Sequence, residues 1–300
     1  MHVRSGALGT VTMVALGVMV GMGGVAHAAL LPGQATPKRL YSNGDSITRA
    51  FDANLPADNL NNSWVNGYFG FWEQLFGLPN VKAHNQRITA NFGSSGRANY
   101  IAAVNGARMD DLATQAAGAA GKSITYATVM LGGNDVCRDS IADLPTNAEF
   151  EANFRAGMAT LLARTASNAT VQVVNIPNVK RLYDLGQDKT ALGIVDCEVL
   201  WAATVLGFPC GSMLSPFNSE ADRLFVQSRN QAYNAIIAAV TAELDTANSE
   251  FVFNANSYAF NFVENEISNI DCFHPSWRGQ RTLSREVWNQ GPFQSFQAGN

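Results

Sequence analysis

The chain has 300 residues, of which 47% are hydrophobic and 15% charged, so it can bury a large core and is neither disordered nor fibrous. Its 20 Lys and Arg residues stand against 24 Asp and Glu residues, giving a formal net charge of -4. This acidic balance, without a basic run, argues against nucleic acid as a partner.

Residues 1–28 have the pattern of a secretory signal peptide. Arg4 supplies a positive charge, residues 8–25 are uncharged and largely apolar, and Ala26-His27-Ala28 resembles a small-x-small cleavage site. An uncleaved membrane anchor is the alternative, but the glycines within the apolar segment weaken a membrane helix. We therefore expect a secreted or periplasmic domain at residues 29–300, in which only two of the four histidines remain.

The strands expected in this domain alternate with helical patterns, which is typical of a parallel sheet with crossover helices. We expect strands at residues 39–43, 101–104, 125–131, 171–176 and 251–253, and apolar helical stripes at residues 150–162 and 233–244. No stretch has the composition of a domain linker. The sequence therefore predicts one α/β domain.

Ser46 follows the first predicted strand in Gly44-Asp45-Ser46. Ligand sites of open parallel sheets lie beyond the carboxyl ends of the strands, so this serine is a candidate nucleophile at a strand-to-helix turn. A serine there can instead cap the next helix, and the segment alone does not decide. Asp45 is expected to order the turn.

Glycine and asparagine follow the next two strands, as Asn105-Gly106 and as Gly132-Gly133-Asn134. A glycine leaves its backbone N–H open to a ligand and an asparagine amide donates without charge, which together suit an oxyanion hole. The same residues are common in ordinary turns.

Asp271 and His274 follow the last predicted strand and are three residues apart. On a tight turn the carboxylate can bond one ring nitrogen while the other faces Ser46, and the chain order Ser, Asp, His occurs in serine hydrolases on α/β scaffolds. The absence of G-x-S-x-G disfavours the nucleophile-elbow hydrolases. His84 is expected at the surface, because its neighbours are polar and no acid is adjacent.

Together these four blocks resemble those of the SGNH or GDSL hydrolase family, named for a Ser, Gly, Asn and His. Two segments, Ser63-Trp64-Val65-Asn66-Gly67 and Asp271-Cys272-Phe273-His274, are similar to the phospholipase B-like branch. The sequence departs from the family pattern at Ile47, where Leu is usual, and at Ile101, where an Asn often precedes the second-block glycine.

The resemblance implies a three-layer α/β/α, flavodoxin-like fold around a mainly parallel five-stranded sheet. It implies Ser46 as nucleophile, His274 as general base and Asp271 as the residue that orients the imidazole. The backbone N–H groups of Ser46 and Gly106 and the amide of Asn134 would form the oxyanion hole. No metal or organic cofactor is expected.

Cys137, Cys197, Cys210 and Cys272 predict two disulfides in an exported protein, with three connectivities open. A zinc site is disfavoured because there is no C-x-x-C or H-E-x-x-H. On the resembling fold, Cys137 and Cys272 belong to the same edge of the sheet. We therefore expect Cys137–Cys272 and Cys197–Cys210, the latter bracketing an apolar segment that either faces an acyl chain or forms a buried helix.

The expected function is hydrolysis of acyl esters by an esterase or lipase, with phospholipids favoured. The partners would be small-molecule or lipid esters, with transient contact to lipid surfaces compatible with this class. Deacetylation of polysaccharide is one alternative, and a non-catalytic secreted binding protein is another. The intact set of Ser46, Asn134, Asp271 and His274 disfavours the non-catalytic alternative.

Overall fold

The computed structural model describes residues 29–202, 210–247 and 251–296. The predicted signal peptide and residues 203–209 of the apolar segment between Cys197 and Cys210 lie outside the described residues. Within the described part of the chain, no helix has the length and hydrophobicity needed to span a bilayer.

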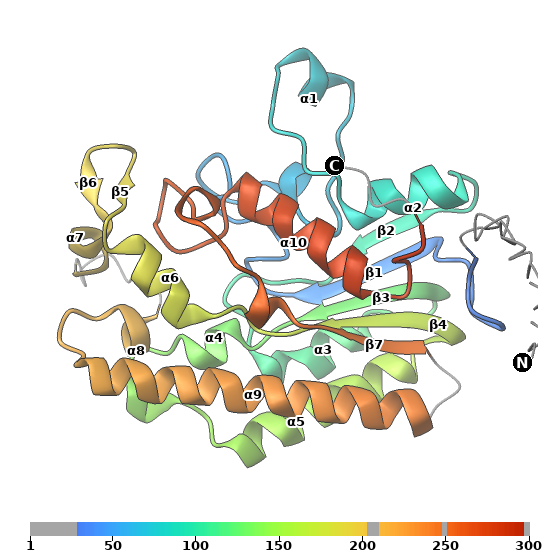
Figure 1. The fold of residues 1–300 in the computed structure, drawn as a ribbon. Helices are drawn as coiled ribbons and strands as arrows, with labels where there is room; N and C mark the ends of the chain where they lie inside the picture. The colour runs from blue at the N-terminus through green and yellow to red at the C-terminus, as the bar shows by residue number, and fades with distance from the viewer. Residues whose placement is uncertain (1–28, 203–209, 248–250, 297–300) are drawn as a thin grey trace, which may run out of the picture.

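The centre of the fold is a five-stranded parallel sheet of order β2-β1-β3-β4-β7 (Figure 1). Its strands are β1 (Arg39–Gly44), β2 (Ala98–Ile101), β3 (Ile124–Met130), β4 (Thr165–Val174) and β7 (Phe251–Ala255). The central strand β3 is buried along nearly its whole length, as expected for a sheet covered on both faces. The predicted single-domain α/β fold is confirmed.

Two strands start three or more residues before the predicted position, whereas the other three start within one residue of it. The strand predicted at 101–104 lies three residues earlier, as β2. It is an edge strand, and its position is set by pairing with β1. It has no apolar run to reveal it. Likewise β4 starts at Thr165 instead of residue 171. The sequence does not indicate this start, because the first four residues are mostly polar and are half-buried or exposed.

Helices cover both faces of the sheet (Figure 1). One face carries α3 (Leu112–Ala117), α5 (Asn147–Leu162) and α9 (Glu220–Ala247), which join the larger apolar core. The other carries α2 (His84–Phe92) and α10 (Trp277–Gln290), around a second apolar cluster. The two predicted helical stripes are confirmed in α5 and α9.

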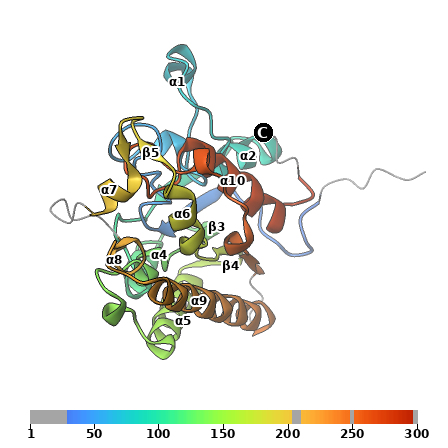
Figure 2. The ribbon, with the colours of Figure 1, turned by 60° about the vertical axis from the view of Figure 1, so that its left-hand side comes forward.

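The remaining helices and strands are short. They are α1 (Phe71–Leu75), α4 (Gly133–Val136), α6 (Val179–Gly186), α7 (Cys197–Ala202), α8 (Gly211–Leu214), and the antiparallel hairpin of β5 (Thr190–Ala191) and β6 (Val195–Asp196). Figure 2 shows α6 and this hairpin over the carboxyl ends of the strands. The site predicted from the sequence lies at the same edge.

Close packing fixes the helices on the larger core. The rings of Phe150 in α5 and Tyr233 in α9 stack with centroids 4.2 Å apart. Gly157 lets α5 approach α3, because a Cβ added there would lie 2.4 Å from the Cγ of Leu112. The capping box of Thr146 and Glu149 defines the start of α5, with the Glu149 N–H donating to the Thr146 hydroxyl at 3.2 Å.

All four cysteines form disulfides, but the expected pairing is wrong. The bonds join Cys137 to Cys210 and Cys197 to Cys272. The two ends of the segment between Cys197 and Cys210 go to different partners, because α8 docks beside the end of α4 while α7 begins next to the Asp271–His274 turn. The hydroxyl of Ser212 in α8 donates to the carbonyl of Val136 in α4 at 2.7 Å, which brings Cys210 to Cys137.

Candidate active site

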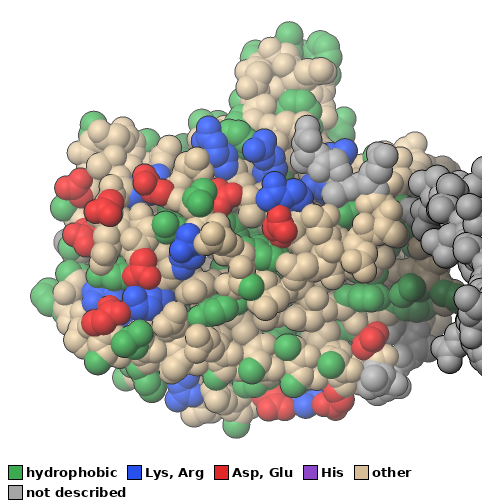
Figure 3. Space-filling model, viewed as in Figure 1, with side chains coloured by type: hydrophobic (Ala, Val, Ile, Leu, Met, Phe, Trp, Pro, Cys, Tyr) green, Lys and Arg blue, Asp and Glu red, His purple; other side chains and the backbone are tan. Residues whose placement is uncertain are grey.

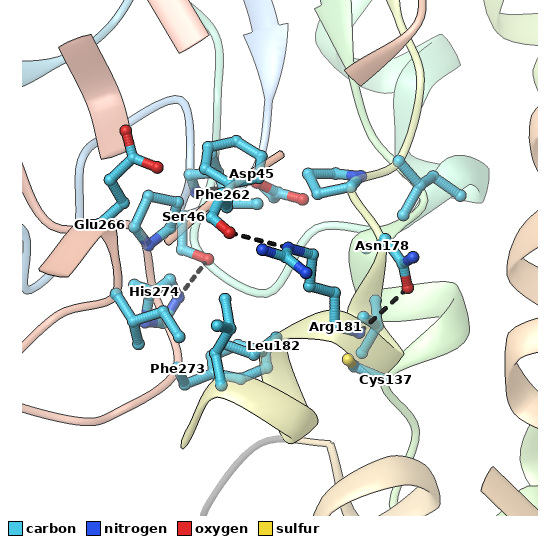
Figure 4. Close-up of a pocket in the computed structure, with 18 of the residues that line it drawn as sticks. Asp45, Ser46, Cys137, Asn178, Arg181, Leu182, Phe262, Glu266, Phe273 and His274 are labelled. Carbon is cyan, nitrogen blue, oxygen red and sulfur yellow. Dashed lines mark hydrogen bonds between the residues drawn. The ribbon is translucent and has the colours of Figure 1, made fainter. Parts of the chain in front are cut away.

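Ser46, His274 and Asp271 form a chain of hydrogen bonds at the carboxyl edge of the sheet. Figure 4 shows the bond between His274 and Ser46. The Nε2 of His274 lies 2.8 Å from the Oγ of Ser46, and its Nδ1 lies 2.5 Å from the Oδ2 of Asp271. All three residues are buried. The arrangement lets the imidazole accept the serine proton while the carboxylate fixes its tautomer.

The position of Ser46 depends on the close turn that ends β1. The N–H of Gly44 donates to the Gln115 side chain at 2.8 Å, and the Gln115 amide donates back to the Gly44 carbonyl at 2.9 Å. A Cβ on Gly44 would lie 2.1 Å from the Oγ1 of Thr48, so this turn requires glycine. The Oδ1 of Asp45 accepts the N–H of Ile47 at 2.9 Å, in agreement with its expected ordering role.

Ser46 does not cap a helix. The residues that follow it form a series of turns rather than a regular helix. Its hydroxyl points to His274 instead of to a backbone N–H. The alternative capping role considered from the sequence is therefore wrong.

The Asp271–His274 turn orients its own carboxylate. The Oδ1 of Asp271 accepts the N–H groups of Phe273 and His274 at 2.9 and 3.1 Å, which leaves Oδ2 facing the imidazole. Cys272 between them has a φ of 56°, in the left-handed region, and is bonded to Cys197. The ring of Phe51 packs against the imidazole with centroids 5.2 Å apart.

The electrostatics keep Asp271 ionised. Burial opposes its charge, but hydrogen bonds from the His274 side chain and from two backbone N–H groups outweigh burial and lower the pKa of Asp271. Burial, together with the nearby Asp271 charge, raises the pKa of Asp52. Burial also raises the pKa values of Asp45 and Asp135 to about 6.

Two of the predicted oxyanion residues occupy different segments: Gly106 lies in the loop after β2, and Asn134 lies in α4. Asn134 lines the same pocket as Ser46, and its Nδ2 donates to the carbonyl of Ala107 at 2.9 Å, so one hydrogen ties it to the loop after β2. Gly106 lies in that loop with a φ of 78° and is exposed. It is not among the residues that line the pocket beside Ser46.

An apolar pocket opens beside Ser46 (Figure 4). Its walls come from α6 and the segment before it, and from the chain that leads to His274. The apolar lining residues are Ile47, Ile176, Pro177, Val179, Leu182, Leu185, Phe262, Ile267, Phe273 and Pro275. Sequence reasoning missed these walls, although Val179, Leu182 and Leu185 recur at helical spacing.

Arg181 and Glu266 also line this pocket, in addition to Asp45 beside Ser46. The Nε of Arg181 donates to the carbonyl of Phe262 at 2.7 Å. Glu266 accepts bonds from the Thr282 hydroxyl and from the N–H of Val263. No carboxylate in the described part of the chain lies within salt-bridge distance of Arg181. Figure 4 shows the guanidinium projecting from α6 toward the side that holds Ser46.

His84 is a core residue, so its expected surface position is wrong. Its Nδ1 lies 2.7 Å from the hydroxyl of Tyr126 and its Nε2 lies 3.1 Å from the carbonyl of Ser284. Trp64 and Trp288 flank the ring edge-to-face, and burial lowers the pKa of His84 to about 3. The short polar run around His84 does not indicate that a helix, α2, begins there and packs between the sheet and α10.

Comparison with solved structures finds several that are similar to this chain. They include a family 3 carbohydrate esterase from Clostridium thermocellum, at 12% identity and a TM-score of 0.46, covering 86% of this chain and 96% of that chain. An extracellular lipase from Streptomyces rimosus and a phospholipase A1 from Streptomyces albidoflavus are each 17% identical, with TM-scores of 0.44 and 0.42; each alignment covers 85% of this chain and 99% of the other.

Sequence comparisons give the family. Comparison with curated proteins yields no match. The profile of the GDSL-like lipase/acylhydrolase family, however, matches residues 42–287. That range includes Ser46, Asn134, Asp271 and His274, and the chain belongs to this family of ester hydrolases.

Proposed function

We propose that this protein is an exported serine ester hydrolase that cleaves acyl esters through an acyl-enzyme on Ser46, with phospholipids as preferred substrates. The observation that carries the proposal is the hydrogen-bonded chain from Ser46 through His274 to Asp271 at the wall of an apolar pocket. Export is supported by the two disulfides, which persist in oxidising compartments.

The chemistry begins at the Ser46 hydroxyl. As its oxygen attacks the ester carbonyl, the Nε2 of His274 accepts its proton, and Asp271 stabilises the imidazolium through Nδ1. Collapse of the tetrahedral intermediate breaks the ester C–O bond, and His274 returns the proton to the leaving alcohol. Water then attacks the acyl-enzyme with His274 as base, which releases the acid and restores Ser46.

The negative oxygen of each intermediate needs donors beside Ser46. We assign the backbone N–H groups of Ser46 and Gly106 and the side-chain amide of Asn134 to this role. Support comes from Asn134, which lines the pocket and has a second Nδ2 hydrogen beyond the one bonded to Ala107. Removing one such donor typically costs about 3 kcal/mol of transition-state stabilisation.

The apolar pocket supports an acyl chain longer than acetate. Val179, Leu182 and Leu185 from α6 and Phe273 from the histidine turn present hydrocarbon beside the nucleophile. Each methylene that leaves water for such a surface gains about 0.8 kcal/mol. An acetyl group would contact little of this wall, so the pocket favours esters of longer acyl chains over acetylated polysaccharide.

Arg181 supports a phosphate group near the scissile ester. Its Nε is already bonded to the carbonyl of Phe262, and its side chain lines the pocket without a carboxylate partner in the described chain. A guanidinium binds phosphate oxygens through paired N–H donors. A phospholipid places its phosphodiester close to its acyl ester bonds, so one pocket can hold both.

Parallel assays test the proposal. Purified protein is given p-nitrophenyl esters of increasing chain length, phospholipid in mixed micelles, and acetylated xylan, and the released acids are measured by mass spectrometry. We expect turnover to rise beyond acetate and to include phospholipid, and Ser46→Ala to abolish it. An organophosphonate should label Ser46.

Other results would decide against the proposal. Release of acetate from xylan as the dominant activity would favour the polysaccharide alternative. Absence of both turnover and labelling would favour the non-catalytic one. Full turnover by a folded Ser46→Ala protein would remove the acyl-enzyme mechanism.

A further inference from the structure

A protrusion projects from the body of the molecule (Figures 1 and 3). It comprises residues 68–78 and contains the short helix α1. No residue of α1 is buried. Its large apolar side chains are between 58% and 69% exposed: Tyr68, Phe71, Trp72, Leu75 and Phe76. So many exposed apolar groups in one short segment mark an interaction surface.

The protrusion has a defined shape. The N–H of Gly70 donates to the carboxylate of Glu73 at 2.9 Å, and the N–H of Leu78 donates to the carbonyl of Glu73 at 2.9 Å. The rings of Trp72 and Phe76 stack with centroids 6.1 Å apart. Glu73 is the one charged residue in the sequence of this segment, and its carboxylate is turned back to the backbone. The tip is therefore apolar and held in place without a partner.

Positive charge lies at the base of the protrusion. Lys82 and Arg281 line a shallow hollow together with Tyr68 and Phe69. Figure 3 shows Lys and Arg side chains gathered beneath the protrusion. Over the described ranges, neither Lys82 nor Arg281 takes part in a salt bridge. The surface thus combines an apolar tip with positively charged side chains at the foot of the protrusion.

We propose that residues 68–78 anchor the protein to an anionic lipid surface. The side chains of Phe71, Trp72 and Phe76 enter the interfacial region, where aromatic residues are favoured, while Lys82 and Arg281 meet lipid phosphates. Basic groups beside an apolar anchor are attracted by the negative potential of such a surface. The charge arrangement is what selects lipid over an uncharged apolar partner.

The ring geometry disfavours a polysaccharide ligand. A sugar chain binds on aromatic rings that share one plane, but the rings of Phe71 and Trp72 are inclined at 74° to each other. The Trp72 and Phe76 rings lie nearly parallel, at 19°, and face one another. Each of these stacked rings leaves its outer face open, and the three rings do not form one flat platform.

The anchoring is independent of the chemistry at Ser46, so it is measured without turnover. Ser46→Ala protein is sedimented with vesicles of phosphatidylcholine alone or mixed with phosphatidylglycerol. We expect binding to the mixed vesicles that weakens with salt. A Phe71→Ser, Trp72→Ser, Phe76→Ser triple variant should bind roughly tenfold or more weakly. Lys82→Gln with Arg281→Gln should lose the preference for the anionic vesicles.

A matched control comes from the opposite side of the sheet. Phe217, between α8 and α9, is 89% exposed, and Phe217→Ser should bind vesicles like the parent. In the background with Ser46 intact, the triple variant should hydrolyse a soluble short-chain ester at the parent rate. Circular dichroism confirms that each variant is folded.

Three results would overturn the anchor. The first is no binding of the parent to either vesicle, and the second is equal binding by parent and triple variant. The third is evidence that the surface binds another ligand. In that case the triple variant would lose binding to insoluble xylan, or self-association in sedimentation velocity, while its vesicle binding stays unchanged.

Discussion

The disulfide between Cys197 and Cys272 ties the first residue of α7 to one of the two residues that lie between Asp271 and His274. Cys272 also has a left-handed backbone, which a non-glycine residue rarely adopts unless its surroundings hold it. The bond therefore acts directly on the turn that presents the imidazole to Ser46.

Replacing both cysteines of this bridge with serine should affect stability and turnover together. Loss of a native disulfide typically costs about 2–5 kcal/mol of unfolding free energy. The freed turn should also lower kcat in protein that remains folded. Urea denaturation and ester hydrolysis measure the two effects. The matched pair Cys137→Ser with Cys210→Ser should lose comparable stability with a smaller change in kcat. A turnover loss confined to the matched pair would contradict this role.

Peptide mapping under non-reducing conditions tests the connectivity itself. We expect peptides that link Cys137 with Cys210 and Cys197 with Cys272, and no free thiol in the native protein. Linked peptides of Cys137 with Cys272 would reinstate the pairing expected from the sequence.

Substitution of the two histidines outside the predicted signal peptide should have very different effects on activity. His274→Gln should reduce ester turnover by roughly 10⁴, because the general base of the triad is lost. His84→Gln should change kcat by less than about threefold in folded protein, since His84 lies in the core with no bond to the triad. Steady-state kinetics on one soluble ester compare them. An inactive, folded His84→Gln protein would be incompatible with this assignment.

His84 should instead make stability depend on pH. Its native pKa, lowered to about 3, lies below the unfolded value of about 6.5, so between these pH values the unfolded chain binds a proton that the native core excludes. The contribution of His84 therefore falls as pH drops from about 6.5 toward 3, by up to several kcal/mol.

Other buried groups act in the opposite direction over part of this range. Asp45 and Asp135 have native pKa values raised to about 6, so they add stability as pH falls from 6 toward 4. The measurement is therefore the difference between wild type and His84→Gln in urea denaturation at several pH values. That difference should shrink as pH falls. A constant difference would show that His84 does not titrate as its burial requires.

Substitution of Arg181 should affect the hydrolysis of phospholipids much more than that of neutral esters. Arg181→Gln should lower kcat/KM for phospholipid by about 10- to 100-fold, the scale of a lost charge-assisted hydrogen bond, while a p-nitrophenyl ester of equal chain length changes little. Arg181→Lys should restore part of the phospholipid rate, because it returns the charge without the paired donors. Equal losses on both substrates would instead indicate damage to α6.

The hydrogen-bonded arrangement of Ser46, Asp271 and His274 was predictable because each part lies in a short recognisable block. Ser46 comes after β1, and Asp271 and His274 are three residues apart on one turn, so short sequence blocks contained the chemistry. The walls of the pocket were not predictable, because apolar residues on α6 have the same pattern as any core-facing helix. The disulfide pairing depended on where α7 and α8 dock, which the spacing of the cysteines does not encode. His84 was misjudged because two indoles from distant segments bury it.

The pocket walls and the reacting groups come largely from different stretches of chain. Ser46 extends from β1, and Asn134 follows the adjacent β3, whose Met130 pairs with Gly44, so their separation is set by the sheet ladder. Residues 179–185 and 262–267 shape the pocket and contribute no member of the triad. Substrate range can therefore change by substitution in these two segments while the catalytic geometry is conserved, which makes them the positions to randomise when altering acyl or headgroup preference.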